Sequence, residues 1–152
     1  LSPTNAFMTL TGIETLPLRM DRHVANAEVV AGWLEDHPAV SWVSYAGLRS
    51  SPSFKNNKNY FPNGCGSVFT FGVKGGFDAG TRLVEGCNLI SHLANVGDTR
   101  SLILHPASTT HRQLTEAQQE AAGAGPDVVR LSVGIETVDD IIADLDQALK
   151  GV

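Results

Sequence analysis

The chain has 152 residues, a formal net charge of −5, and hydrophobic and charged fractions of 42% and 18%. This length suits one domain with a buried core, and the composition is that of a globular rather than a disordered protein. The scattered lysines and arginines argue against a nucleic-acid partner, and no apolar stretch approaches the roughly 18 residues that a membrane span needs. Cys65 and Cys87 lie outside any CxxC pattern, which favours reduced thiols in a cytoplasmic protein and leaves a disulfide between them open.

The first third of the chain has helical periodicity. Apolar residues recur every three or four positions over residues 7–13 and again over residues 20–34. Ser2-Pro3 suits a helix start, with the serine as N-cap and the proline in the first helical position. Pro17 predicts a break in this helical region, and the second helix should close at residues 36–38.

The middle of the chain alternates between strand and loop patterns. Residues 40–47 predict a short strand, and residues 48–66, dense in Ser, Asn, Pro and Gly, predict a long loop. Residues 67–73 form a near-continuous apolar strand that we expect to be buried on both faces. Residues 77–87 should form a helix, and strand-like patterns follow.

The last third completes the fold. Residues 88–98 and 100–111 predict two strand-like pieces, and residues 115–125 predict a short helix capped by Thr115. A strand over residues 127–136 and an amphipathic helix over residues 137–151 close the chain. This order predicts an α+β fold, a mixed sheet covered by helices and open on part of one face, with residues 1–152 forming a single domain.

Arg130 stands in the middle of the last predicted strand. Val129 and Leu131 share one face of that strand, whereas Arg130 and Ser132 share the other. The side chain could point into water, as most arginines do. Alternatively, its planar set of donors could bind a carboxylate with two parallel hydrogen bonds.

Other catalytic arrangements have weak support. Metal-ligand spacing is absent around His105 and His111, and the possible triad of Ser108, His105 and Asp98 lacks the G-x-S-x-G turn of serine hydrolases. Neither cysteine has the local pattern of a nucleophile. Polar residues do gather between positions 95 and 111, where most of the hydroxyl groups should cap and brace turns. The members of this set are Asn95, Asp98, Ser101, His105, Ser108, Thr109, Thr110 and His111.

Three stretches together resemble one family. Residues 12–48, residues 91–111 ("SHLANVGDTRSLILHPASTTH") and residues 129–149 ("VRLSVGIETVDDIIADLDQAL") are similar to the small C-terminal domain of Cys/Met-metabolism enzymes that use pyridoxal phosphate. Within that family the stretch 91–111 is most similar to O-acetylhomoserine sulfhydrylases. The resemblance implies an aspartate-aminotransferase-type (fold type I) enzyme of methionine biosynthesis that makes homocysteine and acetate from O-acetylhomoserine and sulfide. Pyridoxal phosphate would be its electron sink.

The resemblance also implies roles for single residues. Arg130 would bind the α-carboxylate of the amino-acid substrate, Asn95 would border that carboxylate, and Thr110 would be a polar neighbour of the arginine. No catalytic residue is expected in this chain, because the lysine that binds the cofactor lies upstream, in the large domain. The chain's own lysines, in a polar loop, at a strand end and near the terminus, lack surroundings that would activate them. They are Lys55, Lys58, Lys74 and Lys150.

Two alternatives stay open. The parent enzyme could be a cystathionine γ-synthase or lyase of the same family, or the chain could be a freestanding, non-catalytic module that binds amino acids or a partner protein. The chain starts "LSPTNAF" without an initiator methionine, so we expect a fragment whose large, cofactor-binding domain lies upstream. The family resemblance implies that the partners are this large domain and the other subunits of a homo-oligomer, a homotetramer. The isolated fragment is expected to be inactive and to hold no cofactor covalently.

Overall fold

The computed structural model describes residues 1–95 and 97–152. Its sheet has five strands in the order β1-β2-β5-β4-β3. All neighbouring strands run antiparallel except β3 and β4, which are parallel, so the sheet is mixed as the sequence predicts. In chain order the strands are β1 (Val40–Ser44), β2 (Val68–Val73), β3 (Ser91–His92), β4 (Leu102–Leu104) and β5 (Val128–Ser132).

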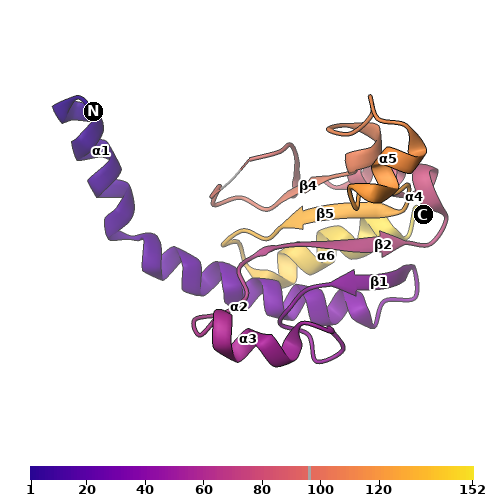
Figure 1. Ribbon diagram of the computed structural model, residues 1–152, viewed down its shortest axis with the longest axis horizontal. Coiled ribbons are helices and arrows are strands. Elements are labelled where there is room, and N and C mark those ends of the chain that lie inside the picture. Colours follow the sequence, from indigo (N-terminus) through magenta and orange to yellow (C-terminus); the bar gives the residue numbers. More distant parts are fainter. Residues whose placement is uncertain (96) are drawn as a thin grey trace.

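Helices cover one face of the sheet and extend beyond it (Figure 1). The α-helices are α1 (Pro3–Glu14), α2 (Leu16–Glu35), α3 (Phe54–Tyr60), α4 (Gly76–Gly86), α5 (Glu116–Ala121) and α6 (Val138–Leu149), and η1 (Pro106–Ser108) is a 3₁₀ turn. Among the described residues, no helix combines the length and apolar character needed to cross a membrane.

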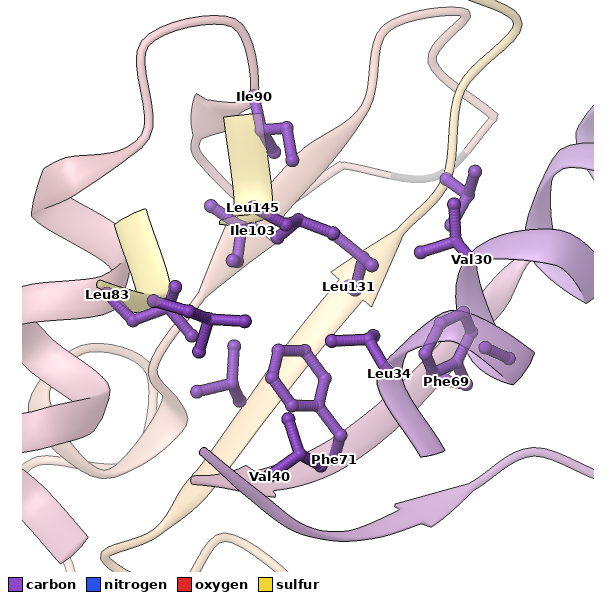
Figure 2. Packing of buried hydrophobic residues seen from close by; sticks show 14 of the residues in the cluster. Val30, Leu34, Val40, Phe69, Phe71, Leu83, Ile90, Ile103, Leu131 and Leu145 are labelled. Atoms are coloured by element: carbon purple, nitrogen blue, oxygen red, sulfur yellow. The ribbon is translucent and has the colours of Figure 1, made fainter. Parts of the chain in front are cut away.

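The hydrophobic core lies between the sheet and the helices α2, α4 and α6. Figure 2 shows side chains of β2, β4 and β5 meeting side chains of these three helices. Phe71, Ile103 and Leu131 on the strands are fully buried, as are Leu34 and Leu145 on the helices. Burying each such side chain stabilises the fold by about 1.5–3 kcal/mol relative to leaving it in water.

The N-terminal helices follow the predicted break. The Ser2 hydroxyl accepts a hydrogen bond from the backbone N–H of Asn5, and Pro3 opens α1. α1 ends at Glu14 and α2 begins at Leu16, because Pro17 cannot donate to the preceding turn. α1 buries none of its residues and extends away from the sheet (Figure 1).

Three local predictions were wrong. The predicted loop 48–66 contains α3, a short polar helix without an apolar stripe that could announce it. β2 is not buried on both faces, since Val68 is 48% exposed and Thr70 is half-buried. Among the described residues of the strand-like region 88–98, only Ser91–His92 forms a strand. The capping of α5 was predicted correctly, because Thr115 and Gln118 form a reciprocal capping box.

Candidate functional site

Arg130 lies at the centre of the sheet, on the face opposite the core. Its Cα is paired with Thr70 of β2 on one side and with Leu104 of β4 on the other. Its neighbours Val129 and Leu131 are fully buried against the helices, so the alternation predicted for this strand is confirmed around Arg130. The arginine is half-buried, which places its guanidinium at the edge of the protein surface rather than fully in water.

A small pocket contains Arg130 and Asn95 together. Its walls come from the segment that follows β3, from β4 and from β5. The lining residues are Leu93, Ala94, Asn95, Leu102, Leu104, Arg130 and Ser132. Apart from the guanidinium, the amide and the Ser132 hydroxyl, these side chains are apolar. The pocket has a volume of about 10 Å³, close to the minimum that holds one water molecule, so it has room for a single group of a ligand, such as an anionic one, rather than for a whole ligand.

The guanidinium of Arg130 is available for such a ligand. Among the described residues, Arg130 has no acidic partner and its side chain makes no hydrogen bond. The nearby carboxylate of Asp98 is bound instead by Arg100, whose Nη2 lies 2.9 Å from Asp98 Oδ2. This side-chain hydrogen bond, together with one from the Arg100 backbone, holds the pKa of Asp98 well below its usual range.

Asn95 contributes an exposed side chain that already has a partner. Its Nδ2 donates to Asp98 Oδ2 at 3.2 Å, which fixes the amide on the rim of the pocket. Asp98 also accepts hydrogen bonds from the Arg100 backbone N–H at 3.0 Å and from Arg100 Nε at 3.1 Å. Asp98 therefore links Asn95 to Arg100.

Thr110 lies outside the pocket of Arg130. It lines an adjoining pocket with His92 and Thr109, and the two pockets share Leu93, Ala94 and Leu104. The Thr110 hydroxyl lies 2.8 Å from His111 Nδ1. The structure thus brings Arg130 and Asn95 together in one pocket and places Thr110 in the adjoining pocket.

His105 has a structural role. It is 1% exposed, its Nε2 lies 2.9 Å from the Pro126 carbonyl, and its Nδ1 lies 3.0 Å from Ser108 Oγ. A carbonyl can only accept, so Nε2 carries a proton. Because Asp98 is bound by Arg100, the combination of Ser108, His105 and Asp98 is not a triad. Since Nε2 carries the proton, the Ser108 hydroxyl donates to His105 Nδ1, and the Thr109 hydroxyl donates to the His105 carbonyl at 2.7 Å, as the turn-bracing interpretation predicts.

The sequence did not predict a buried polar network that lies beyond the end of β5. The carboxylate of Glu136 accepts hydrogen bonds from the Ser101 backbone N–H at 2.6 Å and from the Ser101 hydroxyl at 2.9 Å. Asn26 of α2 donates to the carbonyls of Gly134 and Glu136. His23 Nδ1 lies 2.7 Å from the Val133 carbonyl. These contacts join residues far apart in the chain, so no local pattern reveals them.

Asp144 is a second buried carboxylate that sequence reasoning did not single out. It is 7% exposed and accepts hydrogen bonds from three consecutive backbone N–H groups, those of Asn88, Leu89 and Ile90. The distances are 2.8, 3.0 and 2.9 Å. Asp144 therefore attaches the segment before β3 to α6. The only available signal was an acid on the apolar side of an amphipathic helix.

Both cysteines are free thiols. Burial, with a smaller contribution from Asp144, raises the pKa of Cys87 to about 12. Burial also raises the pKa of Cys65, with a smaller contribution from Glu28. In the described part of the chain, no group of His, Cys, Asp and Glu side chains could hold a metal ion.

The described lysine side chains do not fit covalent binding of a cofactor. Lys55, Lys74 and Lys150 are all exposed. Lys74 Nζ donates to the Pro38 carbonyl at 2.6 Å, and Lys150 Nζ lies 2.5 Å from Asp146 Oδ2. None of the three lines the pocket of Arg130. The pocket therefore offers a guanidinium group without a neighbouring amine nucleophile from these lysines.

A family model for the Cys/Met metabolism PLP-dependent enzymes matches residues 1–150. The chain belongs to this family. It is 52% identical over 149 residues to the homocysteine synthase of Schizosaccharomyces pombe, covering 98% of this chain and 35% of that protein. It is 51% identical to O-acetyl-L-homoserine sulfhydrylase 1 of Thermus thermophilus, with the same coverage. The resemblance stated from the sequence is thereby confirmed, and with it the place of this chain in an enzyme family that depends on pyridoxal phosphate.

A solved structure has the same fold. It is that of a putative O-acetylhomoserine (thiol)-lyase from Campylobacter jejuni, which contains N'-pyridoxyl-lysine-5'-monophosphate. The TM-score is 0.90 at 41% sequence identity, and the match covers 99% of this chain and 36% of that chain. The chain thus spans about 35% of the length of the curated relatives it matches.

Proposed function

We propose that this chain is the C-terminal, substrate-binding domain of a pyridoxal-phosphate-dependent O-acetylhomoserine sulfhydrylase. The whole enzyme would convert O-acetylhomoserine and sulfide into homocysteine and acetate. The observation that carries the proposal is Arg130: a half-buried guanidinium, on the central strand of the sheet, lining a small pocket and without an acidic partner among the described residues. The names of the relatives support the choice of reaction.

In this proposal Arg130 binds the α-carboxylate of the substrate. A guanidinium can donate two parallel hydrogen bonds to a carboxylate, and this fork fixes orientation as well as position. A strand in the middle of a sheet is a rigid support, because β2 and β4 hold β5 from both sides. Fixing the carboxylate orients the bond to the α-hydrogen, and correct orientation is what proton removal at that carbon requires.

Asn95 would border the same carboxylate from the opposite wall of the pocket. Its amide is anchored by Asp98, so the wall holds its shape before substrate arrives. Thr110, in the adjoining pocket, would contribute polarity at a greater distance. Pyridoxal phosphate, when bound by the rest of the protein, supplies the electron sink that stabilises negative charge at the substrate α-carbon.

The proposal assigns the cofactor lysine to a part of the protein outside this chain. The exposed positions of the described lysines support this assignment. The isolated chain mixed with pyridoxal phosphate should form no stoichiometric covalent adduct and show no turnover. A stoichiometric adduct that is lost in Lys74→Ala would contradict the assignment.

The exposed side of α1 supports a large partner within the same polypeptide. Phe7, Leu10 and Ile13 are 71%, 62% and 53% exposed, and α1 buries no residue. Such apolar surface is rarely left in water. We propose that the large domain, and other subunits of a homo-oligomer, cover this surface and complete the site.

The reaction type is tested by assaying the full-length protein with two sulfur donors, sulfide and cysteine. A sulfhydrylase forms homocysteine from O-acetylhomoserine and sulfide. Product formation with cysteine in place of sulfide, and none with sulfide, would identify a cystathionine synthase instead. Absence of any turnover with pyridoxal phosphate present would favour a non-catalytic binding module.

A further inference from the structure

Resting on the proposed function, we propose that Glu136 is a positioning residue for substrate binding. Its carboxylate holds the segment 99–101 against the end of β5, and this attachment sets the spacing between the two walls of the pocket. One wall carries Arg130 on β5, and the other carries Asn95, which lies between β3 and β4 in the chain. Glu136 itself does not line the pocket.

The attachment consists of three short hydrogen bonds and a backbone bridge. Glu136 Oε1 accepts from the Ser101 backbone N–H at 2.6 Å, and Oε2 accepts from the Ser101 hydroxyl at 2.9 Å. The same hydroxyl accepts from the Gly134 N–H at 2.8 Å, and the Ile135 N–H donates to the Thr99 carbonyl at 2.9 Å. Ser101 is fully buried, so water cannot replace these bonds without opening the structure.

Close packing makes the junction rigid. A Cβ atom added to Gly134 would lie 2.2 Å from Glu136 Oε2, 2.4 Å from the Ser101 nitrogen and 2.5 Å from the Thr99 carbonyl oxygen. No side chain fits in this space. The two segments therefore approach as closely as backbone atoms allow, and a glycine at this position is what permits the contact.

The junction is also attached to α2. Asn26 Nδ2 donates to the Gly134 carbonyl at 3.0 Å and to the Glu136 carbonyl at 2.8 Å, and Asn26 is 4% exposed. His23, also 4% exposed, lies 2.7 Å from the Val133 carbonyl through Nδ1. Asn26 and His23 of α2 thus hold the segment that follows β5. On its other side, this segment holds Ser101, just before β4, through Glu136.

A continuous series of contacts leads from this junction to the pocket. Ser101 precedes Leu102, which lines the pocket and begins β4. On the other side of Ser101, Arg100 binds Asp98 with both its side chain and its backbone N–H, and Asp98 accepts from Asn95. Arg130 lies four residues before Gly134, the residue that meets Ser101. Loosening Glu136 should therefore move the Asn95 wall relative to Arg130.

A small movement matters because the pocket recognises a rigid, planar group. Two parallel hydrogen bonds between a guanidinium and a carboxylate tolerate little change in angle or distance. A misplacement of about 1 Å can cost a large factor in function when geometry is the source of the effect. The expected defect is a loss of carboxylate recognition, rather than a uniform loss of ligand affinity.

The test compares two unreactive ligands on the full-length holoenzyme. L-Norleucine has the α-carboxylate and α-amine of the substrate without its leaving group, and L-norleucinamide has an uncharged amide in place of the carboxylate. Calorimetry gives the Kd of each, and the ratio of the amide Kd to the acid Kd measures carboxylate recognition. Glu136→Gln leaves one oxygen for the two Ser101 donors, and we expect it to lower the ratio about five- to tenfold.

Two further variants separate the possible outcomes. Arg130→Ala should bring the ratio of the amide Kd to the acid Kd close to the value for a site that does not distinguish the carboxylate from the amide. Asp144→Asn alters a buried carboxylate that also accepts backbone N–H groups, but on α6, and should leave the ratio unchanged. If Arg130→Ala lowers the ratio while Glu136→Gln changes it no more than Asp144→Asn does, the positioning role is overturned and the proposed function stands. If Arg130→Ala leaves the ratio unchanged, the proposed function itself is wrong.

Ser101→Ala covers the case in which Glu136→Gln does not fold. This variant removes only the hydroxyl, which links Glu136 to Gly134, and keeps the backbone N–H bond to Glu136. It should lower the ratio by a smaller factor than Glu136→Gln. An unchanged ratio in a folded Ser101→Ala protein, in the absence of a folded Glu136→Gln protein, would overturn the positioning role.

Discussion

Arg130 of β5 is the direct cross-strand partner of Thr70 of β2. Opposite residues of an antiparallel pair share a face of the sheet, so the two half-buried side chains lie together on the face away from the core. On the other side of Arg130, Leu104 of β4 occupies the same row. The guanidinium is thus placed by two ladders of backbone hydrogen bonds, rather than by a salt bridge with a carboxylate of the described chain.

Replacing Arg130 should weaken substrate binding in the full-length enzyme. Losing hydrogen bonds to a charged group costs about 1.5–3 kcal/mol, which corresponds to a rise in KM of about 10- to 100-fold, and kcat should fall as the substrate loses its orientation. Steady-state kinetics of Arg130→Ala with O-acetylhomoserine measure both effects. Arg82→Ala is the matched control, because Arg82 is exposed on α4 and, among the described residues, donates only to the Gly151 carbonyl. Equal kinetics of the two variants would exclude the carboxylate-binding role.

Gly134→Ala should destabilise the fold. The new Cβ would meet Glu136, Ser101 and Thr99 at 2.2 to 2.5 Å, so the junction would have to open. Overpacking of this kind typically costs about 1–3 kcal/mol of unfolding free energy, measured by urea denaturation. Gly32→Ala is the opposite case: nothing lies within 4 Å of its Cβ, and alanine in the interior of α2 should add about 0.5–1 kcal/mol. Equal stabilities of the two variants would be inconsistent with this packing.

The thiol of Cys87 should resist alkylation at pH 8. With its pKa raised to about 12 by burial, only about one molecule in ten thousand carries the thiolate at that pH, against a substantial fraction for an unfolded cysteine. Iodoacetamide labelling followed by mass spectrometry should show slow reaction in the native protein and rapid reaction in urea. Rapid native labelling of Cys87 would mean that the thiol is neither buried nor raised in pKa.

The same shift predicts a dependence of stability on pH. Because the folded-state pKa of Cys87 lies above the value of about 8.5 in an unfolded chain, its contribution to stability is complete below pH 8.5. That contribution is lost as the pH rises toward about 12. Cys87→Ala should therefore reduce the decline of the unfolding free energy over this range, as measured by urea denaturation at several pH values. If the unfolding free energy of Cys87→Ala declines with pH as steeply as that of the parent, groups other than Cys87 cause the decline.

The apolar side of α1 should stabilise only the complete protein. In Phe7→Gln/Leu10→Gln, the full-length protein should lose about 1–3 kcal/mol for each side chain that the large domain buries. The isolated chain should unfold at the same temperature as its parent, because both side chains are already more than 60% exposed. Thermal unfolding of both forms makes the comparison. A full-length protein that unfolds unchanged would mean that this side of α1 faces solvent.

Local signals in the sequence predicted the elements that carry them. The start of α1 at Ser2 and Pro3, the break at Pro17 and the capping box of Thr115 each depend on residues within four positions of one another. By contrast, α3 has no apolar stripe, so its polar residues predicted a loop rather than a helix. Val68 belongs to an apolar run, but only tertiary packing decides that it is 48% exposed.

The candidate site divides in the same way. Arg130 could be singled out because a charge interrupts an apolar strand, and the family resemblance then suggested its role and that of Asn95. Glu136, Asn26 and His23 gave no such signal, since their partners lie more than 30 positions away. Those contacts exist only once α2, β5 and the turn before β4 have come together.

Carboxylate binding by Arg130 is tested most directly by a crystal structure of the full-length protein with bound L-norleucine. Both carboxylate oxygens should lie about 2.7–2.9 Å from the guanidinium nitrogens of Arg130, in a two-bond arrangement. Asn95 should lie on the other side of the ligand. A carboxylate bound to another cation, with the Arg130 side chain turned away from the ligand, would contradict carboxylate binding by Arg130.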